Sequence, residues 1–189
     1  MSDKIIIKIM NSIPIITNMM GPHEIYGILK HLQYILENDI PGDIVEFGCF
    51  VGTVSIFIRK MLDEYNSNRL FHVYESWKGL PKKHEKDTSS DSRQFNEGMF
   101  KTNKQDFLNV FQNFELKIPI IHDGEFANIP DDNYPNRIAF IFIDGDFYTS
   151  TRDALNKVYL KLVNNGIILI DDCGWAPYYR VLNLRVKNF

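Results

Sequence analysis

Residues 41–55 read PGDIVEFGCFVGTVS, and this stretch places a short strand-like segment directly before a glycine-bearing turn. Residues 43–47, DIVEF, predict a buried strand that begins after the break at Pro41 and Gly42. Residues 54–65, VSIFIRKMLDEY, then have the apolar spacing of an amphipathic helix. The stretch therefore predicts a strand, a turn and a helix in succession, the unit from which parallel sheets are built.

Outward from this unit, strands and helices alternate along the chain. Upstream, residues 23–39 carry apolar side chains at helical spacing, whereas residues 1–20 are apolar without a pattern. Further strands are expected at 70–76, 117–123, 137–144 and 166–172, and further helices at about 101–114 and 149–163. This alternation predicts an α/β fold, with a mostly parallel sheet that carries helices on both faces.

The length of the chain bounds its organisation. With 189 residues, we expect a single domain over 1–189, in which residues 1–40 supply an N-terminal segment and helix. Residues 77–99 are polar, charged and rich in turn formers, which is typical of a mobile surface loop. This loop is either a lid over a functional site or an inert insertion.

Charge and cysteine content narrow the classes of partner. The formal net charge is -3, from 21 Lys and Arg against 24 Asp and Glu, so no broad cationic surface is available for nucleic acid. Cys49 and Cys173 stand in no disulfide or zinc spacing, which indicates a reducing compartment. No run approaches the roughly 18 to 20 apolar residues of a membrane span. We therefore expect a cytoplasmic protein with a small-molecule ligand and no membrane partner.

Acids and glycines follow the predicted strands, and ligands of parallel α/β sheets bind beyond these carboxyl ends. Glu75 ends the second predicted strand, 23 residues after Gly52, where an acid can accept hydrogen bonds from two ribose hydroxyls. The turn at 48–52 lacks the G-x-G-x-x-G pattern of pyrophosphate binding. Alone, that turn fits a plain connection from strand to helix as well as it fits a ligand site; together with Glu75 it indicates a nucleoside ligand.

Three aspartates follow the last two predicted strands. Asp144 ends the strand at 137–144, and Asp171 and Asp172 end the strand at 166–172. If these strands are neighbours, three carboxylates meet at one rim of the sheet, where their repulsion favours a bound cation. Oxygen ligands of this kind suit Mg²⁺. The alternative is that the acids are helix caps and exposed turn residues.

Four blocks of sequence, PGDIVEFGCFVGTVS, YESWKGLP, IDGDFYTSTRDAL and GIILIDDCGW, together resemble the macrocin O-methyltransferase family of class I S-adenosylmethionine-dependent methyltransferases. The resemblance runs from about residue 20 to residue 175. It implies a Rossmann-like fold and the cofactor S-adenosyl-L-methionine. Members of this family methylate hydroxyls on deoxysugars of natural products.

The resemblance also implies which residues contact the cofactor and the metal. The implied cofactor residues are Glu46, Gly48, Gly52, Glu75, Ser76, Gly124, Glu125 and Phe126. The first three belong to the turn under the methionine moiety, the next two lie at the ribose, and the last three flank the adenine unless they form only a turn or hairpin. The implied Mg²⁺ ligands are Asp144, Asp171 and Asp172.

The implied activity is a Mg²⁺-dependent O-methyl transfer to a hydroxyl of a sugar or related small-molecule diol. Two vicinal hydroxyls on Mg²⁺ would be acidified and aligned with the methyl donor. Related catechol-type enzymes place a lysine base shortly after the first metal-binding acid, but residues 145–148 contain no lysine. Asp144 itself or Asp146 is therefore the expected proton acceptor, although Asp146 is equally suited to bracing its loop. The alternative function is a catalytically silent nucleoside-binding or assembly protein derived from a methyltransferase.

The end of the sequence suggests a departure from this family. A class I methyltransferase sheet ends with an antiparallel hairpin after its fifth strand, whereas residues 173–189 are enough for a short helix or one strand. We therefore expect truncated C-terminal strands, and an exposed sheet edge that favours a homo-oligomer. The identity of the acceptor cannot be read from the polar loop or the N-terminal segment.

Overall fold

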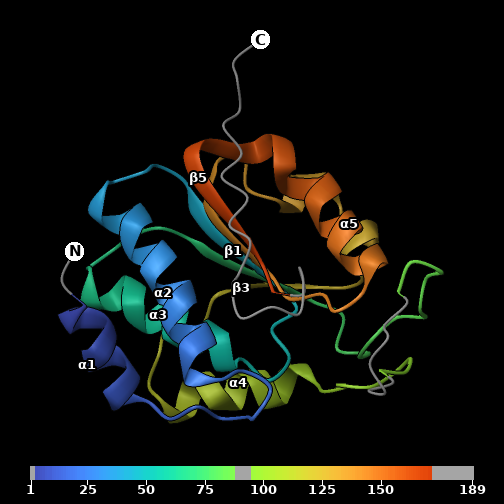
Figure 1. Cartoon of the computed structure of the whole chain (residues 1–189), viewed down its shortest axis with the longest axis horizontal. Helices are drawn as coiled ribbons and strands as arrows, with labels where there is room; N and C mark the ends of the chain where they lie inside the picture. Colours follow the sequence, from blue (N-terminus) through green and yellow to red (C-terminus); the bar gives the residue numbers. More distant parts are fainter. Residues whose placement is uncertain (1–2, 88–94, 172–189) are drawn as a thin grey trace.

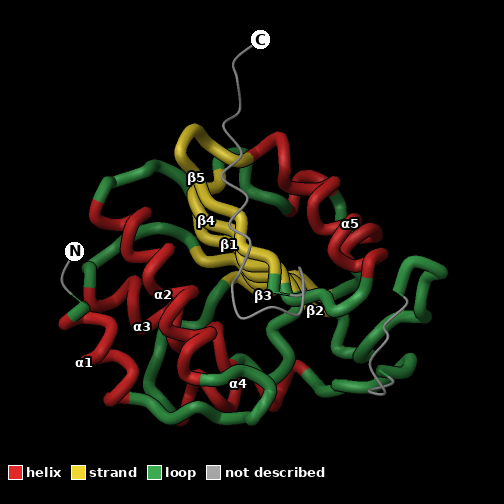
Figure 2. The backbone as a smooth tube through the Cα atoms, viewed as in Figure 1, coloured by secondary structure: helices red, strands yellow, loops and turns green. Residues whose placement is uncertain are grey.

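The computed structural model describes residues 3–87 and 95–171. Its centre is a sheet of five strands in which all neighbouring strands are parallel (Figures 1 and 2). The strands, in the spatial order β3-β2-β1-β4-β5, are β1 Asp43–Phe47, β2 Phe71–Glu75, β3 Ile120–Asp123, β4 Ile138–Ile143 and β5 Leu162–Ile170. The α/β architecture predicted from the sequence is confirmed.

Helices cover both faces of this sheet, as predicted. The α-helices are α1 Lys4–Ser12, α2 Pro22–Glu37, α3 Thr53–Glu64, α4 Lys104–Asn113 and α5 Tyr148–Val158. Figure 1 shows α1 to α4 on one side of the sheet and α5 on the other. Short 3-10 turns, η1 Phe126–Asn128, η2 Asp131–Asn133 and η3 Tyr159–Lys161, complete the side that carries α5.

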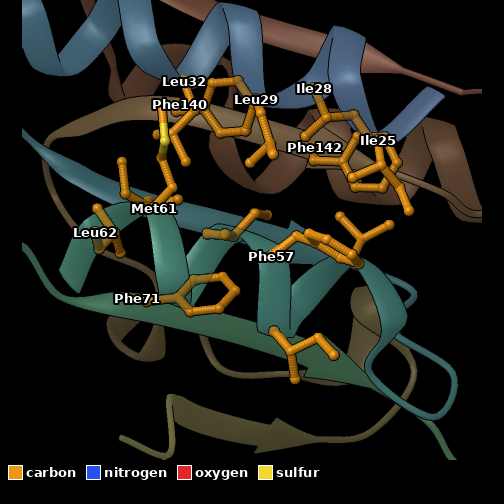
Figure 3. Close-up of a cluster of buried hydrophobic side chains, with 14 of the residues drawn as sticks. Ile25, Ile28, Leu29, Leu32, Phe57, Met61, Leu62, Phe71, Phe140 and Phe142 are labelled. Atoms are coloured by element: carbon orange, nitrogen blue, oxygen red, sulfur yellow. The ribbon is translucent and has the colours of Figure 1, made fainter. Parts of the chain in front are cut away.

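Side chains of β1, β2, β4 and β5 alternate between two hydrophobic cores. Phe140 and Phe142 of β4 belong to the core under α2 and α3, whereas Ile141 and Ile143 belong to the core under α5. Figure 3 shows Phe142 beside Ile25 of α2 in the first of these cores. Burial of each such side chain contributes about 2 to 3 kcal/mol. A strand that is buried on both faces reads as a continuous apolar run, as β4 does, whereas β1 also carries Asp43 and Glu46.

Several boundaries differ from the sequence-based expectation, most of all those of α1, α5 and β5. Residues 1–20 were expected to have no regular pattern, but Lys4–Ser12 forms α1. Ile6 and Ile9 are fully buried and Ile13 nearly so, a spacing of three and four residues that the intervening isoleucines hide in the sequence. The helix expected at 149–163 ends at Val158, because Leu162 already pairs with Ile138 as the first residue of β5.

Residues 172–189 lie outside the described part of the chain. The expectation that the C-terminal strands are truncated concerns these residues, so it stays a prediction. Among the residues described, no helix has both the length and the apolar character needed to cross a membrane.

Candidate functional site

A large cleft lies over the carboxyl ends of the strands. The chain leaves β1 toward β2, whereas β4 pairs with the other side of β1, so β1 and β4 form the topological switch point of the sheet. The loops after these two strands diverge there, which is where α/β sheets bind ligands. The cleft has a volume of about 1560 Å³ and includes residues from the turns after β1, β2, β3, β4 and β5. It is therefore the candidate site.

The turn after β1 passes very close to the end of β4. Gly48 has a φ of +78°, and a Cβ at this position would overlap the carbonyl oxygen of Asp144. Its backbone N–H donates to the carbonyl of Tyr74 at 3.0 Å. Gly52 also has a positive φ, of +94°, and precedes the first residue of α3. Glycine is required at Gly48 because both the backbone conformation and the space exclude a side chain; Gly48 lines the cleft, whereas Gly52 only shapes the turn.

Glu46 lies beneath this turn and does not line the cleft. Its side chain is fully buried on the α3 side of the sheet, where the Ser55 hydroxyl donates to Oε2 at 2.6 Å. Oε1 has no hydrogen-bond partner among the described residues. Burial raises the pKa of Glu46 to about 8, and repulsion by Glu75 adds to this effect while the Ser55 bond opposes it. Glu46 is thus protonated at neutral pH.

Glu75 joins the turns that follow β1 and β2. Its Oε2 accepts the backbone N–H of Phe50 at 3.1 Å, and its Oε1 accepts those of Ser76 at 2.7 Å and Trp77 at 3.1 Å. The carboxylate is half-buried and lines the cleft together with Ser76. A carboxylate oxygen can accept more than one hydrogen bond, so Oε2 retains capacity for a ligand hydroxyl.

The segment after β3 forms a further wall of the cleft. Glu125 and Phe126 line it, whereas Gly124 lies at its base and donates its N–H to the carbonyl of Glu75 at 2.9 Å. Glu125 accepts from Lys78 at 3.2 Å. The ring of Phe126 packs edge-on against Phe47, with ring centres 5.0 Å apart. Phe126 therefore adds an aromatic ring to the lining of the same cleft as Glu75.

Acids meet at the rim formed by β4 and β5. Ile143 pairs with Ile170, so the next residues, Asp144 and Asp171, leave neighbouring strands side by side, and both line the cleft. Asp146 lines the cleft as well and has a left-handed backbone with a φ of +57°. Asp172 lies outside the described residues. Within 3–87 and 95–171, no group of three or more His, Cys, Asp or Glu side chains is arranged to hold a metal ion.

Several lining residues were not predicted. They come from the segment between α1 and α2, from the start of α2, from the loop after β2 and from α5, and include Asn18, Met19, His23, Glu24, Lys78, Leu80, Phe95, Phe100, Thr149 and Asp153. Residues 13–21 carry no periodic signal that could have revealed this role. The aromatic residues of the loop were a usable signal, because large apolar side chains are unusual in an otherwise polar loop.

The described ends of the 77–99 loop border the cleft. The N–H of Leu80 donates to the carbonyl of Met99 at 2.8 Å, and the N–H of Gly98 donates to the carbonyl of Leu80 at 2.9 Å. On the α5 side, Asp87 accepts the N–H of Tyr148, the first residue of α5, at 2.7 Å. Residues 88–94 lie outside the described part of the chain, so the lid hypothesis stays a prediction.

Comparisons with known proteins agree with this architecture. Among solved structures, the chain resembles the O-methyltransferase NovP with a TM-score of 0.69 and 25% identity, over 80% of this chain and 65% of that one. The calicheamicin methyltransferase CalS11 has the same fold, with a TM-score of 0.65 at 18% identity over 90% of this chain and 76% of that one. The Rossmann-like methyltransferase fold is therefore confirmed.

Curated relatives are O-methyltransferases of natural-product pathways. The chain is 31% identical to 8-demethyl-8-(2,3-dimethoxy-alpha-L-rhamnosyl)-tetracenomycin-C 4'-O-methyltransferase of Streptomyces olivaceus, over 79% of this chain and 62% of that protein. It is 28% identical to mycinamicin III 3''-O-methyltransferase of Micromonospora griseorubida, over 82% of this chain and 64% of that protein. The chain thus spans a little under two thirds of the length of these relatives. The model of the macrocin O-methyltransferase (TylF) family matches residues 11–187, and the chain belongs to this family.

Proposed function

We propose that the chain is an S-adenosylmethionine-dependent O-methyltransferase that acts on a hydroxyl of a sugar or related small-molecule diol. The observation that carries this proposal is the cleft at the switch point, which joins Glu75 on one side to Asp144 and Asp171 on the other. Family membership and the activities named for the relatives support the same reaction class.

The residues on the β1 and β2 side fit a nucleoside cofactor. The positive φ of Gly48 lets the turn after β1 pass close to the end of β4, which brings this turn to the cleft. Glu75 offers a charged acceptor to two ribose hydroxyls, with Ser76 beside it. Phe126 offers an apolar surface to a purine ring. Glu46 and Gly52 would act from beneath, by shaping the turn.

The residues on the β4 and β5 side fit a divalent cation. Asp144 and Asp171 present carboxylate oxygens from neighbouring strand ends, and hard cations such as Mg²⁺ prefer oxygen ligands. Two like charges at one rim favour a bound cation over an empty rim. Asp172, the third proposed ligand, follows directly in the sequence. When bound, Mg²⁺ would supply a Lewis acid that lowers the pKa of an acceptor hydroxyl.

An acid at this rim would also receive the proton of that hydroxyl. Asp146 lines the cleft two residues after Asp144, in the turn that leads into α5. A carboxylate in reach of the acceptor can act as a general base. Asp144 is the alternative base. If Asp146 has only a structural role in its turn, Asp146→Asn should leave turnover normal.

Binding and turnover assays test the proposal in two stages. Calorimetric titration with S-adenosylhomocysteine, with and without Mg²⁺, measures cofactor binding without an acceptor. Methyl transfer to a panel of diol-bearing sugars and glycosides, with EDTA as control, then measures the reaction. Cofactor binding without transfer to any acceptor would favour the alternative, a silent nucleoside-binding protein. The single-domain organisation, cytoplasmic location and self-association stay predictions.

A further inference from the structure

We propose that Trp77 is a positioning residue that, together with Asp123 and Lys104, orients Glu75 toward the ribose of the cofactor. This inference rests on the proposed function, because it concerns how Glu75 binds. Trp77 itself is absent from the lining of the cleft among the described residues, so it would act on the cofactor only through Glu75.

The backbone of Trp77 is held in an unusual conformation. Its φ is +62°, in the left-handed region that bulky residues rarely adopt. In this conformation its N–H donates to Oε1 of Glu75 at 3.1 Å, next to the N–H of Ser76 at 2.7 Å. Two successive N–H groups thus donate hydrogen bonds to Oε1 of Glu75. Oε2 accepts the Phe50 N–H and remains available to a ligand in the cleft.

The side chain of Trp77 explains why this conformation persists. The indole Nε1 donates to Oδ1 of Asp123 at 2.7 Å, and the ring packs against Phe107 of α4 with ring centres 5.8 Å apart. Asp123 is the partner of Glu75 in the β2 and β3 register, so the indole bonds to the residue beside Glu75 on the neighbouring strand.

Lys104 completes the arrangement from the start of α4. Its Nζ donates to Oδ2 of Asp123 at 2.6 Å, so each oxygen of Asp123 has its own donor. Burial alone would raise the pKa of Asp123, but the hydrogen bonds from Lys104 and Trp77 outweigh it and hold this pKa below its ordinary value. Asp123 therefore stays an ionised acceptor at neutral pH and anchors the indole firmly.

A chain of contacts thus runs from Lys104 through Asp123 and Trp77 to Glu75. Without the indole hydrogen bond, Trp77 loses a side-chain contact that holds its backbone in the left-handed conformation, and the backbone can relax to a negative φ. Relaxation would remove one of the two N–H donors at Oε1, and the carboxylate of Glu75 would no longer be fixed in one orientation. The effect should be confined to ligand atoms that Glu75 binds.

Calorimetry with two cofactor probes tests this selectivity. The variant is Trp77→Phe, which keeps an aromatic ring against Phe107 and removes the indole N–H. The probes are S-adenosylhomocysteine and its 2′,3′-dideoxy analogue, which lacks the hydroxyls assigned to Glu75. We expect the dissociation constant of S-adenosylhomocysteine to rise about five-fold, and that of the analogue to change by less than about two-fold.

Two further variants separate positioning from general loss of structure. Tyr65→Phe is the matched control: it removes an aromatic donor that bonds to Glu37 at 2.9 Å, near the amino end of β1 and away from the cleft, and should leave both dissociation constants unchanged. In the Glu75→Gln background, adding Trp77→Phe should weaken S-adenosylhomocysteine binding no further, because both changes act through one group.

The outcomes are distinct. Equal weakening of both probes by Trp77→Phe, or no weakening, overturns the positioning role, as does additivity with Glu75→Gln. If Trp77→Phe does not fold, Asp123→Ala removes the acceptor of the same hydrogen bond, and it must likewise weaken the binding of the hydroxylated probe more than that of the dideoxy probe. If the parent protein binds neither probe, the proposed function itself has failed, and this inference fails with it.

Discussion

Replacement of Glu46 by glutamine should stabilise the protein, and increasingly so as the pH rises. In the folded chain the pKa of Glu46 is about 8, against a reference value of 4.5, because the carboxyl is fully buried and, among the described residues, forms a hydrogen bond only with the Ser55 hydroxyl. Between pH 4.5 and about 8, Glu46 is ionised in the unfolded chain but protonated in the folded chain. The free energy of unfolding therefore falls by about 1.4 kcal/mol per pH unit in this window.

The magnitude follows from the width of that window. This contribution to stability is fully present below pH 4.5, is lost as the pH rises, and is fully lost above about pH 8. At pH 7 the loss is up to about 3 kcal/mol. Glutamine has the shape of the protonated acid and can still accept the Ser55 hydroxyl, but it does not titrate. Glu46→Gln should recover most of this loss at pH 7 and little of it at pH 5.

Urea unfolding of parent and variant at pH 5, 7 and 8.5 measures the difference directly. Glu85→Gln, which changes an exposed carboxylate, is the control and should give no pH-dependent difference. A difference between Glu46→Gln and the parent that stays constant from pH 5 to 8.5 would refute the reasoning. It would mean that Glu46 is ionised in the folded protein at neutral pH, despite its burial.

Three further predictions concern the cofactor, the metal and the β2–β3 edge. Glu75→Ala should weaken S-adenosylhomocysteine by about 2 to 3 kcal/mol in calorimetry, since it removes a charged acceptor; unchanged affinity would show that Glu75 does not bind the ribose. Asp144→Asn should lower methyl transfer by orders of magnitude with little change in the melting temperature, and transfer retained both in this variant and by the parent in EDTA would exclude a catalytic Mg²⁺. Burial and then the nearby His122 lower the pKa of His72 to about 4, so unfolding should become easier as the pH falls from 6.5 toward 4, because only the unfolded chain takes up that proton. His72→Gln should flatten this part of the stability curve in thermal melts, and an unchanged slope would contradict the assignment.

The sequence was most informative where burial on both faces leaves a simple signature. The strands β1 and β4 were predicted almost to the residue, because segments rich in Ile, Val and Phe end there at a glycine or an acid. The same logic placed Glu75, Asp144 and Asp171 at strand ends, and the structure brings all three to one cleft. Parallel pairing explains this success, because it places the carboxyl ends of all strands on the same side of the sheet.

Contacts between residues far apart in the chain could not be predicted from the sequence. Nothing near Trp77 indicates that its indole would bond to Asp123, 46 residues away, or that its backbone would be left-handed. The segment between α1 and α2 reaches the cleft only because α1 packs against α3. Glu46 was assigned to the cofactor turn. The sequence could not show that its side chain is buried against Ser55 beneath this turn and does not line the cleft.

The central claim is that one cleft holds a nucleoside cofactor beside a divalent cation. A crystal structure of the protein with S-adenosylhomocysteine and Mg²⁺ tests it most directly. We predict the ribose hydroxyls on Glu75, the adenine against Phe126, and the cation on the carboxylates of Asp144 and Asp171. A cofactor bound elsewhere, or a cofactor in the cleft with no cation at these aspartates at saturating Mg²⁺, would contradict the account.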